Sequence, residues 1–350
     1  MTHVAGEATV TAEESVTGVQ HSTATPHVAA VVLNWNGAED TITCVESLLR
    51  STHPCLSVII CDNASRDDSV ERIRGWGATI STSHPTFAFK EWTPHDVGRS
   101  GNDLAGTVNL VRSERNGGYA AGNNLAMRFA LEDPSVVAVW ILNNDVVVEE
   151  SALTEAWAVL RDDDRIGIVG ATLRYYERSD VIQCQAGGSF VPRKGLAETI
   201  GAGRPATDPL SADHVLSRLD FINGAAALVS RRMIETVGMM SEDYFLYWEE
   251  LDWAYRARSI FQLSYAPAAV IRHKVGASIG TNDHGEGSVL SEYYYNRNRL
   301  RFCWRHSRTS LPYVWMQLSW DLLRAIASRR RRRATVLSRA MLGLPGPQPS

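Results

Sequence analysis

Cysteine is scarce in this sequence and never occurs in a pattern typical of a disulfide framework or a metal site. The five cysteines, spread from Cys44 to Cys303 in a chain of 350 residues, include no Cys-X-X-Cys pair. This spacing excludes the scaffold of a small disulfide-rich domain and a cysteine-based zinc site. We therefore expect reduced thiols, as in the cytoplasm.

Long apolar segments are also missing. No stretch of about 18 uncharged apolar residues occurs, so no ordinary transmembrane helix is predicted. The first residues, MTHVAGEATV, lack a basic segment followed by an apolar block, so no secretory signal is predicted. With 44% hydrophobic and 21% charged residues the chain can bury a core. These features predict a cytoplasmic globular protein.

Lysine is absent from the most basic part of the chain. Residues 293–339 contain twelve arginines and one acid, Asp321, and therefore carry a charge of +11. Because the whole chain has a net charge of −4 and residues 340–350 are uncharged, residues 1–292 carry −15. A basic tail on an acidic body predicts an anionic partner for the tail, and a solvated helix face is the alternative.

Short apolar runs alternate with helical patterns through the first part of the chain. We expect strands at 27–33, 57–61, 108–111 and 136–142, with helices at 39–50, 68–76 and 125–131 between them. This order predicts an α/β fold with a Rossmann-like, mostly parallel sheet and helices on both faces.

The remainder is patterned less regularly. We expect a helix at 151–160, strands at 166–173, 220–229 and 263–272, and a helical region from 291 to 343. Residues 1–27 are predicted to form a disordered leader, 81–107 a surface insertion, and 344–350 a flexible end, while 186–213 shows no clear pattern. The folded domain is predicted to span 28–290.

Polar residues gather where the predicted strands end. They are Asn34 and Asn36, Asp62 and Asn63, the run 116–124, and Asn143 to Asp145. Parallel strands place such ends at one edge of a sheet, so one ligand cleft is predicted, although Asn, Asp and Gly also favour ordinary turns. Neither GxGxxG after the first strand nor GxxxxGK[ST] occurs, which excludes the usual phosphate loops. A carboxylate such as Asp145 could instead hold Mg²⁺ or Mn²⁺.

Eight segments carry a resemblance to a known family. They are Val31–Asn36, Cys61–Ser65 with Asp67, Arg115–Asn124, Ile141–Asp145, Asn223–Ala226, Tyr244–Trp253 with Arg256, His273 with Ser278, and Tyr293–Arg299. In this order they resemble the family 2 glycosyltransferases of the GT-A fold, and most closely a bacterial rhamnosyltransferase-like branch. The resemblance covers roughly residues 28–306 and implies a nucleotide-binding half (28–145) and an acceptor half (146–290).

The resemblance also implies roles for individual residues. Asp62 would accept a hydrogen bond from the donor base, Asp145 and His273 would bind a metal ion, and Trp248 and Arg256 would contact the acceptor. The implied nucleotide-binding set is Asn34, Asn36, Asp62, Asn63, Asn116, Gly122, Asn123, Asn143 and Asn144. The family usually has Glu-Asp where this chain has Glu249-Glu250, and the second acid is the general base. Glu250 is therefore the expected base, with Glu249 and Asp252 left open.

These residues also have plainer interpretations. Glu249, Glu250 and Asp252 could form a solvated helix face, His273 could be structural, and Asp62 could cap a helix. The tyrosines at 293–295 and the tryptophans could belong to the core.

The implied function is an inverting, metal-dependent transfer of a sugar from a nucleoside diphosphate, with Mn²⁺ or Mg²⁺ as cofactor. Rhamnose is the expected sugar and dTDP or UDP the expected nucleotide, while the acceptor could be a saccharide, a lipid-linked saccharide or a natural product. Two alternatives remain: a sugar nucleotidyltransferase, whose GxGTR-type loop is not found here, and a non-catalytic nucleotide-sugar-binding protein.

The tail predicts an amphipathic helix. Apolar residues recur at 311, 314, 315, 318, 322, 325 and 326, and Arg329 to Arg333 follow. Such a helix could lie on an anionic membrane surface, here the inner face of the cytoplasmic membrane. It could instead dock on the body or on a second subunit in a homodimer. No nucleic-acid partner is expected, because the body is acidic and has no nucleic-acid-binding motif.

Overall fold

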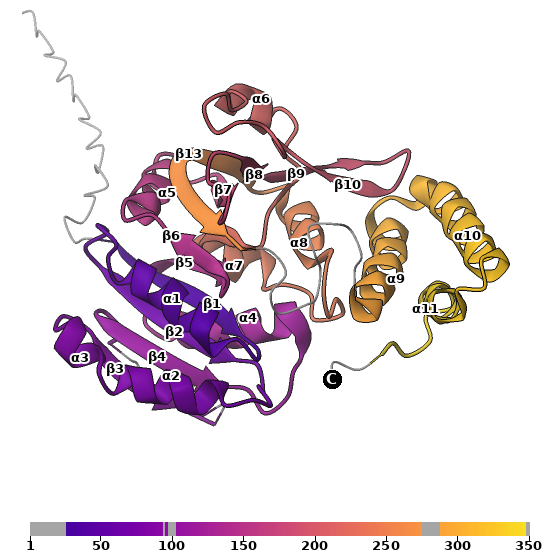
Figure 1. Ribbon diagram of the computed structural model, residues 1–350. Helices are drawn as coiled ribbons and strands as arrows, with labels where there is room; N and C mark the ends of the chain where they lie inside the picture. The colour runs from indigo at the N-terminus through magenta and orange to yellow at the C-terminus, as the bar shows by residue number, and fades with distance from the viewer. Residues whose placement is uncertain (1–25, 94, 97–102, 275–287, 348–350) are drawn as a thin grey trace, which may run out of the picture.

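A computed structural model of the protein describes residues 26–93, 95–96, 103–274 and 288–347. Most of the predicted leader, the last three residues of the predicted flexible end, and Ser278 lie outside this described part. A ten-stranded sheet forms the centre of the molecule, and a group of helices from the C-terminal part of the chain lies beside it (Figure 1).

The sheet has strand order β3-β4-β2-β1-β5-β12-β7-β13-β6, and β8 pairs with β7. Its strands are β1 (His27–Asn34), β2 (Leu56–Asp62), β3 (Ala88–Trp92), β4 (Thr107–Arg112), β5 (Val136–Asn143), β6 (Val146–Val148), β7 (Ile166–Tyr175), β8 (Ile182–Gln185), β12 (Ala226–Ser230) and β13 (Gln262–His273). The five strands from β3 to β5 are parallel, whereas β12 runs antiparallel to both of its neighbours.

The register of the parallel strands places polar residues together. β1 is buried without a break from Val28 to Val32, as expected for a strand covered on both faces. In its pairing with β2, Asn34 lies opposite Asp62, and in its pairing with β5, Leu33 lies opposite Asn143. The polar ends of three strands therefore meet at one edge, as the sequence predicts.

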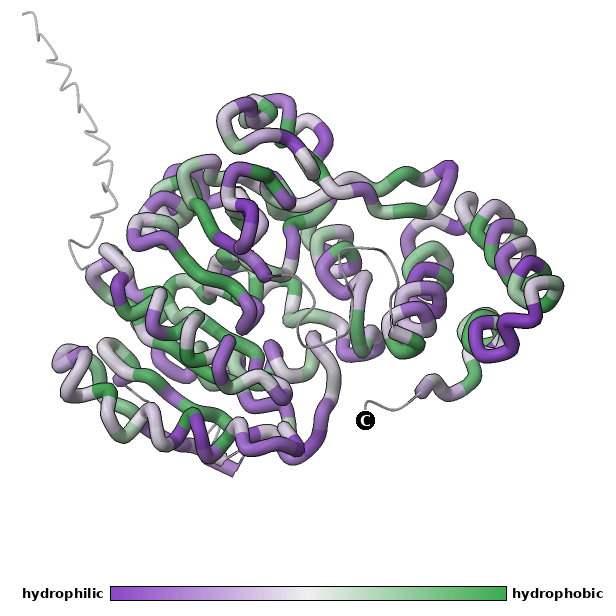
Figure 2. Tube along the Cα trace, in the orientation of Figure 1, coloured by the Kyte–Doolittle hydropathy of each residue, from purple (hydrophilic) through white to green (hydrophobic). Residues whose placement is uncertain are grey.

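Helices cover both faces of the sheet and bury its apolar side chains. The helices are α1 (Ala38–Leu48), α2 (Ser69–Gly77), α3 (Ile80–Ser83), α4 (Gly118–Leu131), α5 (Ala152–Arg161), α6 (Ala212–Leu216), α7 (Arg231–Val237) and α8 (Glu249–Ala257). One core lies under α1, α2 and α5, and a second lies under α4, α7 and α8. Figure 2 shows the resulting band of hydrophobic strands between the helices. The predicted mostly parallel α/β sheet is confirmed.

Two irregular stretches contain more structure than the sequence predicts. Within the predicted surface insertion 81–107, β3 pairs in parallel with β4, and the Trp92 ring lies 5.3 Å from that of Phe129. Within 186–213, β9 (Gly187–Val191) pairs with β10 (Leu196–Thr199) and with β11 (Phe221–Ile222) in a small second sheet. The sequence shows no strand pattern in either segment, because pairing with a neighbouring strand, rather than local pattern, makes these residues extended.

Two predicted boundaries also change. α4 begins at Gly118 rather than at 125, so most of the glycine- and asparagine-rich run is helical. The predicted strand 220–229 is divided into β11 and β12, because the Asn223 side chain accepts a hydrogen bond from the Ala225 amide (2.9 Å) and turns the chain.

The C-terminal region is helical, as predicted. It comprises α9 (Val289–His306), a 3-10 turn (Arg308–Ser310), α10 (Leu311–Ala327) and α11 (Arg331–Met341). Val314 and Leu318 of α10 pack with Trp248 and Phe190 of the body in one apolar cluster. Within the described residues, no helix is both long and apolar enough to cross a bilayer.

A buried arginine joins this region to the body. The Arg299 guanidinium donates to the carbonyls of Gly195 (2.7 Å) and Lys194 (2.7 Å) and to Gln317 Oε1 (2.9 Å). One side chain thus connects α9 to the β9–β10 turn and to α10. Because Arg299 is 2% exposed, these bonds are shielded from bulk water.

We expect Arg299→Ala to destabilise the protein by about 3 kcal/mol, since it leaves buried carbonyl oxygens without donors. Arg299→Lys should recover only part of the loss, because an ammonium group lacks the planar fork. Urea unfolding of both variants measures this. Arg297→Ala, a more exposed arginine of the same helix, is the control and should cost less than about 1 kcal/mol. Equal losses at the two positions would contradict this role for Arg299.

Candidate active site

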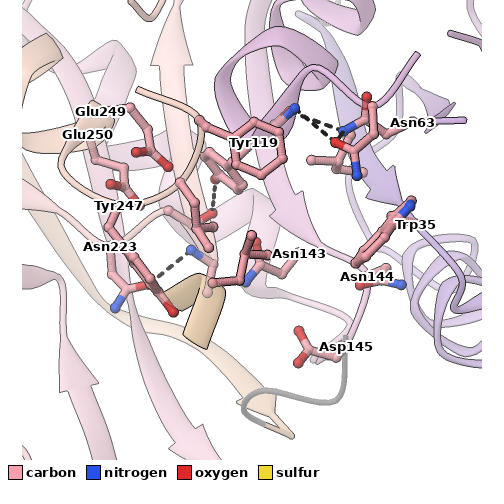
Figure 3. A pocket seen from close by; sticks show the side chains of 18 of the residues that line it. Trp35, Asn63, Tyr119, Asn143, Asn144, Asp145, Asn223, Tyr247, Glu249 and Glu250 are labelled. Carbon is pink, nitrogen blue, oxygen red and sulfur yellow. Dashed lines mark hydrogen bonds between the residues drawn. The ribbon is translucent and has the colours of Figure 1, made fainter. Parts of the chain in front are cut away.

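A cavity of about 320 Å³ lies at the carboxyl ends of β1 and β5, between that edge of the sheet and the start of α8 (Figure 3). It brings together half of the predicted site residues. They are Asn63, Asn116, Asn143, Asn144, Asp145, Glu249, Glu250 and His273. In Figure 3, Glu249 and Glu250 lie on one side of the cavity, and Trp35 and Asn63 lie on the other.

Asn34, Asn36 and Asp62 do not line this cavity. Asp62 accepts hydrogen bonds from the Asn34 amide (2.8 Å) and from the hydroxyl and backbone N–H of Ser65 (2.5 and 3.1 Å). Asn36 accepts a bond from the Arg66 amide (2.8 Å). In the structure these three residues make hydrogen bonds that hold together the loops after β1 and β2.

Gly122 and Asn123 are also outside the cavity, and their nucleotide-binding role stays a prediction. A Cβ at Gly122 would collide with Leu33 of β1, so this glycine allows α4 to pack closely on the sheet. The Asn123 amide donates to the Tyr119 carbonyl (3.0 Å) within the same helix, and the residue is fully buried. Both residues serve packing because α4 begins earlier than the sequence indicates.

Asp252 is buried away from the cavity, so the structure lends no support to its place among the catalytic candidates. Its carboxylate is bound by Arg256 (2.9 Å), His306 (2.8 Å) and Tyr244 (3.2 Å). Arg256 also donates to the carbonyls of Val237 and Met239, and its contact with an acceptor stays a prediction. This cluster ties α8 to α9.

Trp248 is not in the cavity either, and its acceptor contact stays a prediction. Tyr247 and Trp248 both have left-handed backbone angles, with φ of 67° and 77°. This turn sends Trp248 into the aromatic cluster beside Phe190 and Phe302, while Tyr247 lines the cavity. Such a strained turn directly before Glu249 is typical of a functional site.

Several lining residues were missing from the predicted set. They are Leu33, Trp35, Gly118, Tyr119, Asn223, Gly224, Ala225, Phe245, Leu246, Tyr247 and Leu290. Most belong to the segments that carry the family resemblance, and from those segments they could have been predicted as lining residues. Tyr119 shows what they contribute: its hydroxyl donates to the Gly224 carbonyl (2.6 Å) and joins the two halves of the cavity wall.

One corner of the cavity holds an aspartate and a histidine in contact. Asp145 Oδ1 lies 3.1 Å from His273 Nε2, and His273 Nδ1 lies 2.8 Å from Gln183 Oε1. Burial alone would raise the pKa of Asp145, but His273 and Lys274 hold it below its ordinary value. The contact between Asp145 and His273 is a hydrogen bond when Nε2 carries the proton; when Nδ1 carries it and donates to Gln183, the lone pair of Nε2 can instead bind a cation beside the Asp145 carboxylate.

This corner therefore presents a nitrogen and a carboxylate oxygen to the same point, which suits Mn²⁺ or Mg²⁺. No group of three or more His, Cys, Asp or Glu side chains with metal-site geometry occurs in the described part of the chain. The pair accordingly fits a cation whose other ligands come from a bound phosphate and water.

Across the cavity from Glu249 and Glu250, the side-chain amides of Asn63 and Asn116 hold the loop before α4 in place. Asn63 donates to Asn116 Oδ1 (3.0 Å) and to the Gly118 carbonyl (3.1 Å), and it accepts from the Gly117 amide (3.3 Å). The Gly118 amide in turn donates to Asn116 Oδ1 (2.9 Å). Gly118 has φ of 86°, and a Cβ there would collide with the Phe245 carbonyl.

Glu249, which is buried, and Glu250, which is half-buried, form an acid pair at the first turn of α8. Burial raises the pKa of Glu249 well above its ordinary value, and the neighbouring Glu250 raises it further. Burial also raises the pKa of Glu250, although the amides of Glu250 and Gly224 limit the rise. Glu249 Oε2 is buried without a hydrogen-bond partner, which costs less for a protonated acid than for a carboxylate. The unpartnered Oε2 therefore favours the protonated form of Glu249.

We expect Asp252→Asn to cost about 3 kcal/mol of stability at neutral pH, because it removes the buried carboxylate that binds the half-buried Arg256 guanidinium and the His306 ring. Burial acts to raise the pKa of Asp252, but His306 and Arg256 hold it below its ordinary value. The carboxylate therefore stabilises the fold above the usual aspartate pKa of about 3.9, and this contribution disappears as the pH falls below it.

Urea unfolding at a series of pH values tests this behaviour. The difference in free energy of unfolding between parent and variant should shrink as the pH is lowered. Asp243→Asn is the control. Asp243 pairs with Arg305, but its side chain is 54% exposed, so a loss of at most about 1 kcal/mol is expected. A gap for Asp252→Asn that stays constant down to the acid limit would be inconsistent with this account.

Comparison with known proteins places the chain near sugar-transferring enzymes. No family model matches it. It is 25% identical over 207 residues to the low-salt glycan biosynthesis hexosyltransferase Agl10 of Haloferax volcanii, which covers 58% of this chain and 61% of that protein. The chain thus matches less than two thirds of the length of this relative.

Solved structures share the fold. The mannosyltransferase PcManGT from Pyrobaculum calidifontis, in complex with GDP-Man and Mn²⁺, has a TM-score of 0.52 at 17% identity and covers 91% of this chain and 86% of its own. GalNAc-T7 with UDP, GalNAc and Mn²⁺ has a TM-score of 0.55 at 13% identity, covering 81% and 50%. TarS 1–349 of S. aureus with UDP-GlcNAc has a TM-score of 0.50 at 12% identity, covering 91% and 82%. These similarities confirm the expected GT-A-type fold.

Proposed function

We propose that this chain is a glycosyltransferase that moves a sugar from a nucleoside-diphosphate donor to a hydroxyl group of an acceptor. The observation that carries the proposal is one cavity lined by both the Asp145–His273 pair and the Glu249–Glu250 pair. The hexosyltransferase relative supports it, as do neighbours whose structures contain nucleotide sugars and Mn²⁺. Membership of family 2 and of its rhamnosyltransferase-like branch is part of the proposal and rests on the eight sequence segments.

The donor occupies the sheet side of the cavity in this proposal. Asn63, Asn116 and Trp35 face the nucleoside, and Asn143 and Asn144 lie towards the diphosphate. Asp145 and His273 would hold a divalent cation, which stabilises the negative charge of the leaving diphosphate. The proposed sugar is rhamnose, carried by dTDP or UDP.

The acceptor approaches from the side of α8. In an inverting transfer the acceptor oxygen bonds to the anomeric carbon while the bond from that carbon to the diphosphate oxygen breaks. Glu250 takes the hydroxyl proton during this displacement, because it lines the cavity and is more exposed than Glu249, whose Oε2 is buried without a partner. A base with a raised pKa is matched to work near neutral pH. The proposed acceptor is a saccharide, free or lipid-linked, or a natural product.

A donor-binding experiment tests the metal corner. We expect Mn²⁺ to strengthen binding of dTDP, UDP or GDP by at least about tenfold over EDTA, and Asp145→Asn to remove this gain. Titration calorimetry of each nucleotide with and without Mn²⁺ measures both effects and identifies the preferred base.

The matched control for Asp145→Asn is Asp133→Asn. Asp133 is also buried beside a histidine, His27 (3.6 Å), but at the opposite end of β1 from the cavity. Nucleotide affinity that is the same in EDTA and Mn²⁺ would refute the metal role.

A transfer assay tests the base. Glu250→Gln should lower turnover by about 10²–10⁴ at saturating donor while nucleotide affinity is retained, because the amide cannot accept the proton. Glu249→Gln, which mimics a protonated acid, should retain most turnover. Burial raises the pKa of Glu250. As the pH is lowered, the parent rate should therefore begin to fall at a pH above the ordinary glutamate pKa of about 4.3.

The same assay separates the alternatives. Near-normal turnover in Glu250→Gln, with collapse in Glu249→Gln, would assign the base to the other acid. Nucleotide binding without transfer to any acceptor in the parent would favour a non-catalytic sugar-binding protein. Formation of a nucleotide sugar from a sugar phosphate would favour the nucleotidyltransferase.

A further inference from the structure

Helix α10 has an apolar face that nothing in the described structure covers. Met316, Trp320 and Leu323 are 61%, 56% and 59% exposed, and Tyr313 continues the same stripe towards the N-terminus. Their spacing of three or four residues places them on one side of the helix. Trp315 and Ile326 widen the stripe and are also exposed.

The opposite side of α10 is already used. Val314, Leu318 and Ala325 are buried against the body. Met316 and Trp320 each follow a buried residue by two positions, a rotation of about 200° around the helix. The helix is therefore apolar on two opposite sides, which is typical of a helix with a partner on each of them.

Exposed apolar side chains are concentrated in this region. Large exposed hydrophobic residues of the described chain lie on the body at Val137, Leu216 and Ile260, and in the tail at Trp304, Tyr313, Trp315, Met316, Trp320, Leu323, Ile326, Leu342 and Leu344. Scattered single residues such as Ile260 need no explanation, whereas a contiguous patch on one helix marks an interaction surface.

Arginines border this patch. Arg329 to Arg333 are all exposed; they run from the end of the α10–α11 connection into the first turn of α11 and form the strongly hydrophilic segment beside α10 in Figure 2. Of these five, Arg333 pairs with Glu292 (2.7 Å), and the other four have no carboxylate within 4 Å among the described residues. Arg324 lies over the Trp320 ring at 5.2 Å, and Arg308 lies over the Trp304 ring at 5.0 Å.

We propose that the outer face of α10 and the Arg329–Arg333 run bind the surface of an anionic lipid bilayer. The tryptophans, Met316 and Leu323 enter the boundary between headgroups and acyl chains, and the arginines contact lipid phosphates. Tryptophan and arginine are the side chains that combine an apolar body with a polar end suited to this boundary. An amphipathic helix beside a basic cluster binds by both contributions together.

Charge favours lipid over a second copy of the chain. The Arg329–Arg333 run carries +5 and only Arg333 is paired with an acid among the described residues, so two copies paired here would bring two basic runs together. An anionic bilayer instead neutralises the arginines and covers the apolar stripe at once. This proposal goes beyond the transfer reaction and does not depend on it, because α10 contributes no residue to the cavity.

Vesicle flotation of the full chain tests the proposal. The vesicles contain phosphatidylcholine alone, or phosphatidylcholine with about one third phosphatidylglycerol. The parent should float with the anionic vesicles at low salt, less so at near-physiological salt, and hardly at all with the neutral ones.

Two sets of substitutions divide the contributions. Met316→Ser, Trp320→Ser and Leu323→Ser together, and Arg330→Ala, Arg331→Ala and Arg332→Ala together, should each weaken binding on the order of 100-fold. The matched controls are Leu216→Ser with Ile260→Ser, and Arg161→Ala with Arg165→Ala, which are exposed on the body and should bind vesicles as the parent does. Thermal unfolding and nucleotide calorimetry confirm that every variant folds.

The outcomes are decisive. Failure of the folded parent to float with anionic vesicles at low salt overturns the proposal. So does sedimentation velocity that shows a dimer dissociated by the α10 substitutions, which would assign the face to a second copy. If the parent floats with anionic vesicles but transfers no sugar, that result would count against the proposed function and leave this inference standing.

Discussion

A buried hydrogen bond between the Asn34 amide and the Asp62 carboxylate holds the edge of the sheet on which the cavity is built. Both side chains are at most 2% exposed, so each must find its partners within the protein. Asn34 Oδ1 accepts from Thr41 (2.7 Å), and Thr41 accepts from Asn144 (3.1 Å). The loops after β1, β2 and β5 are therefore positioned by one connected network, which places Asp145 beside His273.

The acid pair depends on a second, more distant support. Tyr247 and Trp248 adopt left-handed angles immediately before α8, and the packing of Trp248 against Phe302 of α9 offsets that strain. Asp252 binds His306, so α9 also holds the helix that carries Glu249 and Glu250. The C-terminal helices are thus part of the structure that positions the candidate catalytic groups.

The two alternatives for the tail, docking on the body or binding a surface, are compatible in the structure. A helix has more than one face, and α10 uses Val314 and Leu318 for the fold while Trp320 and Leu323 remain outside. A single apolar stripe read from the sequence combined residues of both faces, since Trp315 and Ile326 belong to the outer one. Burial, which the pattern does not contain, separates the two.

The sequence by itself determined the parallel half of the sheet and the polar character of its edge. Runs such as 28–32 are apolar without interruption, and only a strand covered on both faces accommodates them. It also located the segments that surround the cavity, because Asn143 to Asp145 and Glu249-Glu250 follow recognisable patterns.

Only the tertiary structure decided which side chains of those segments face the cavity. Asn63 lines it while Asp62 turns into the network below, and Glu250 lines it while Asp252 turns towards α9. Neighbouring residues on a strand or helix point in different directions. The direction that meets the cavity is set by contacts with Asn34 and His306, which are distant in the sequence and come close only when the chain has folded.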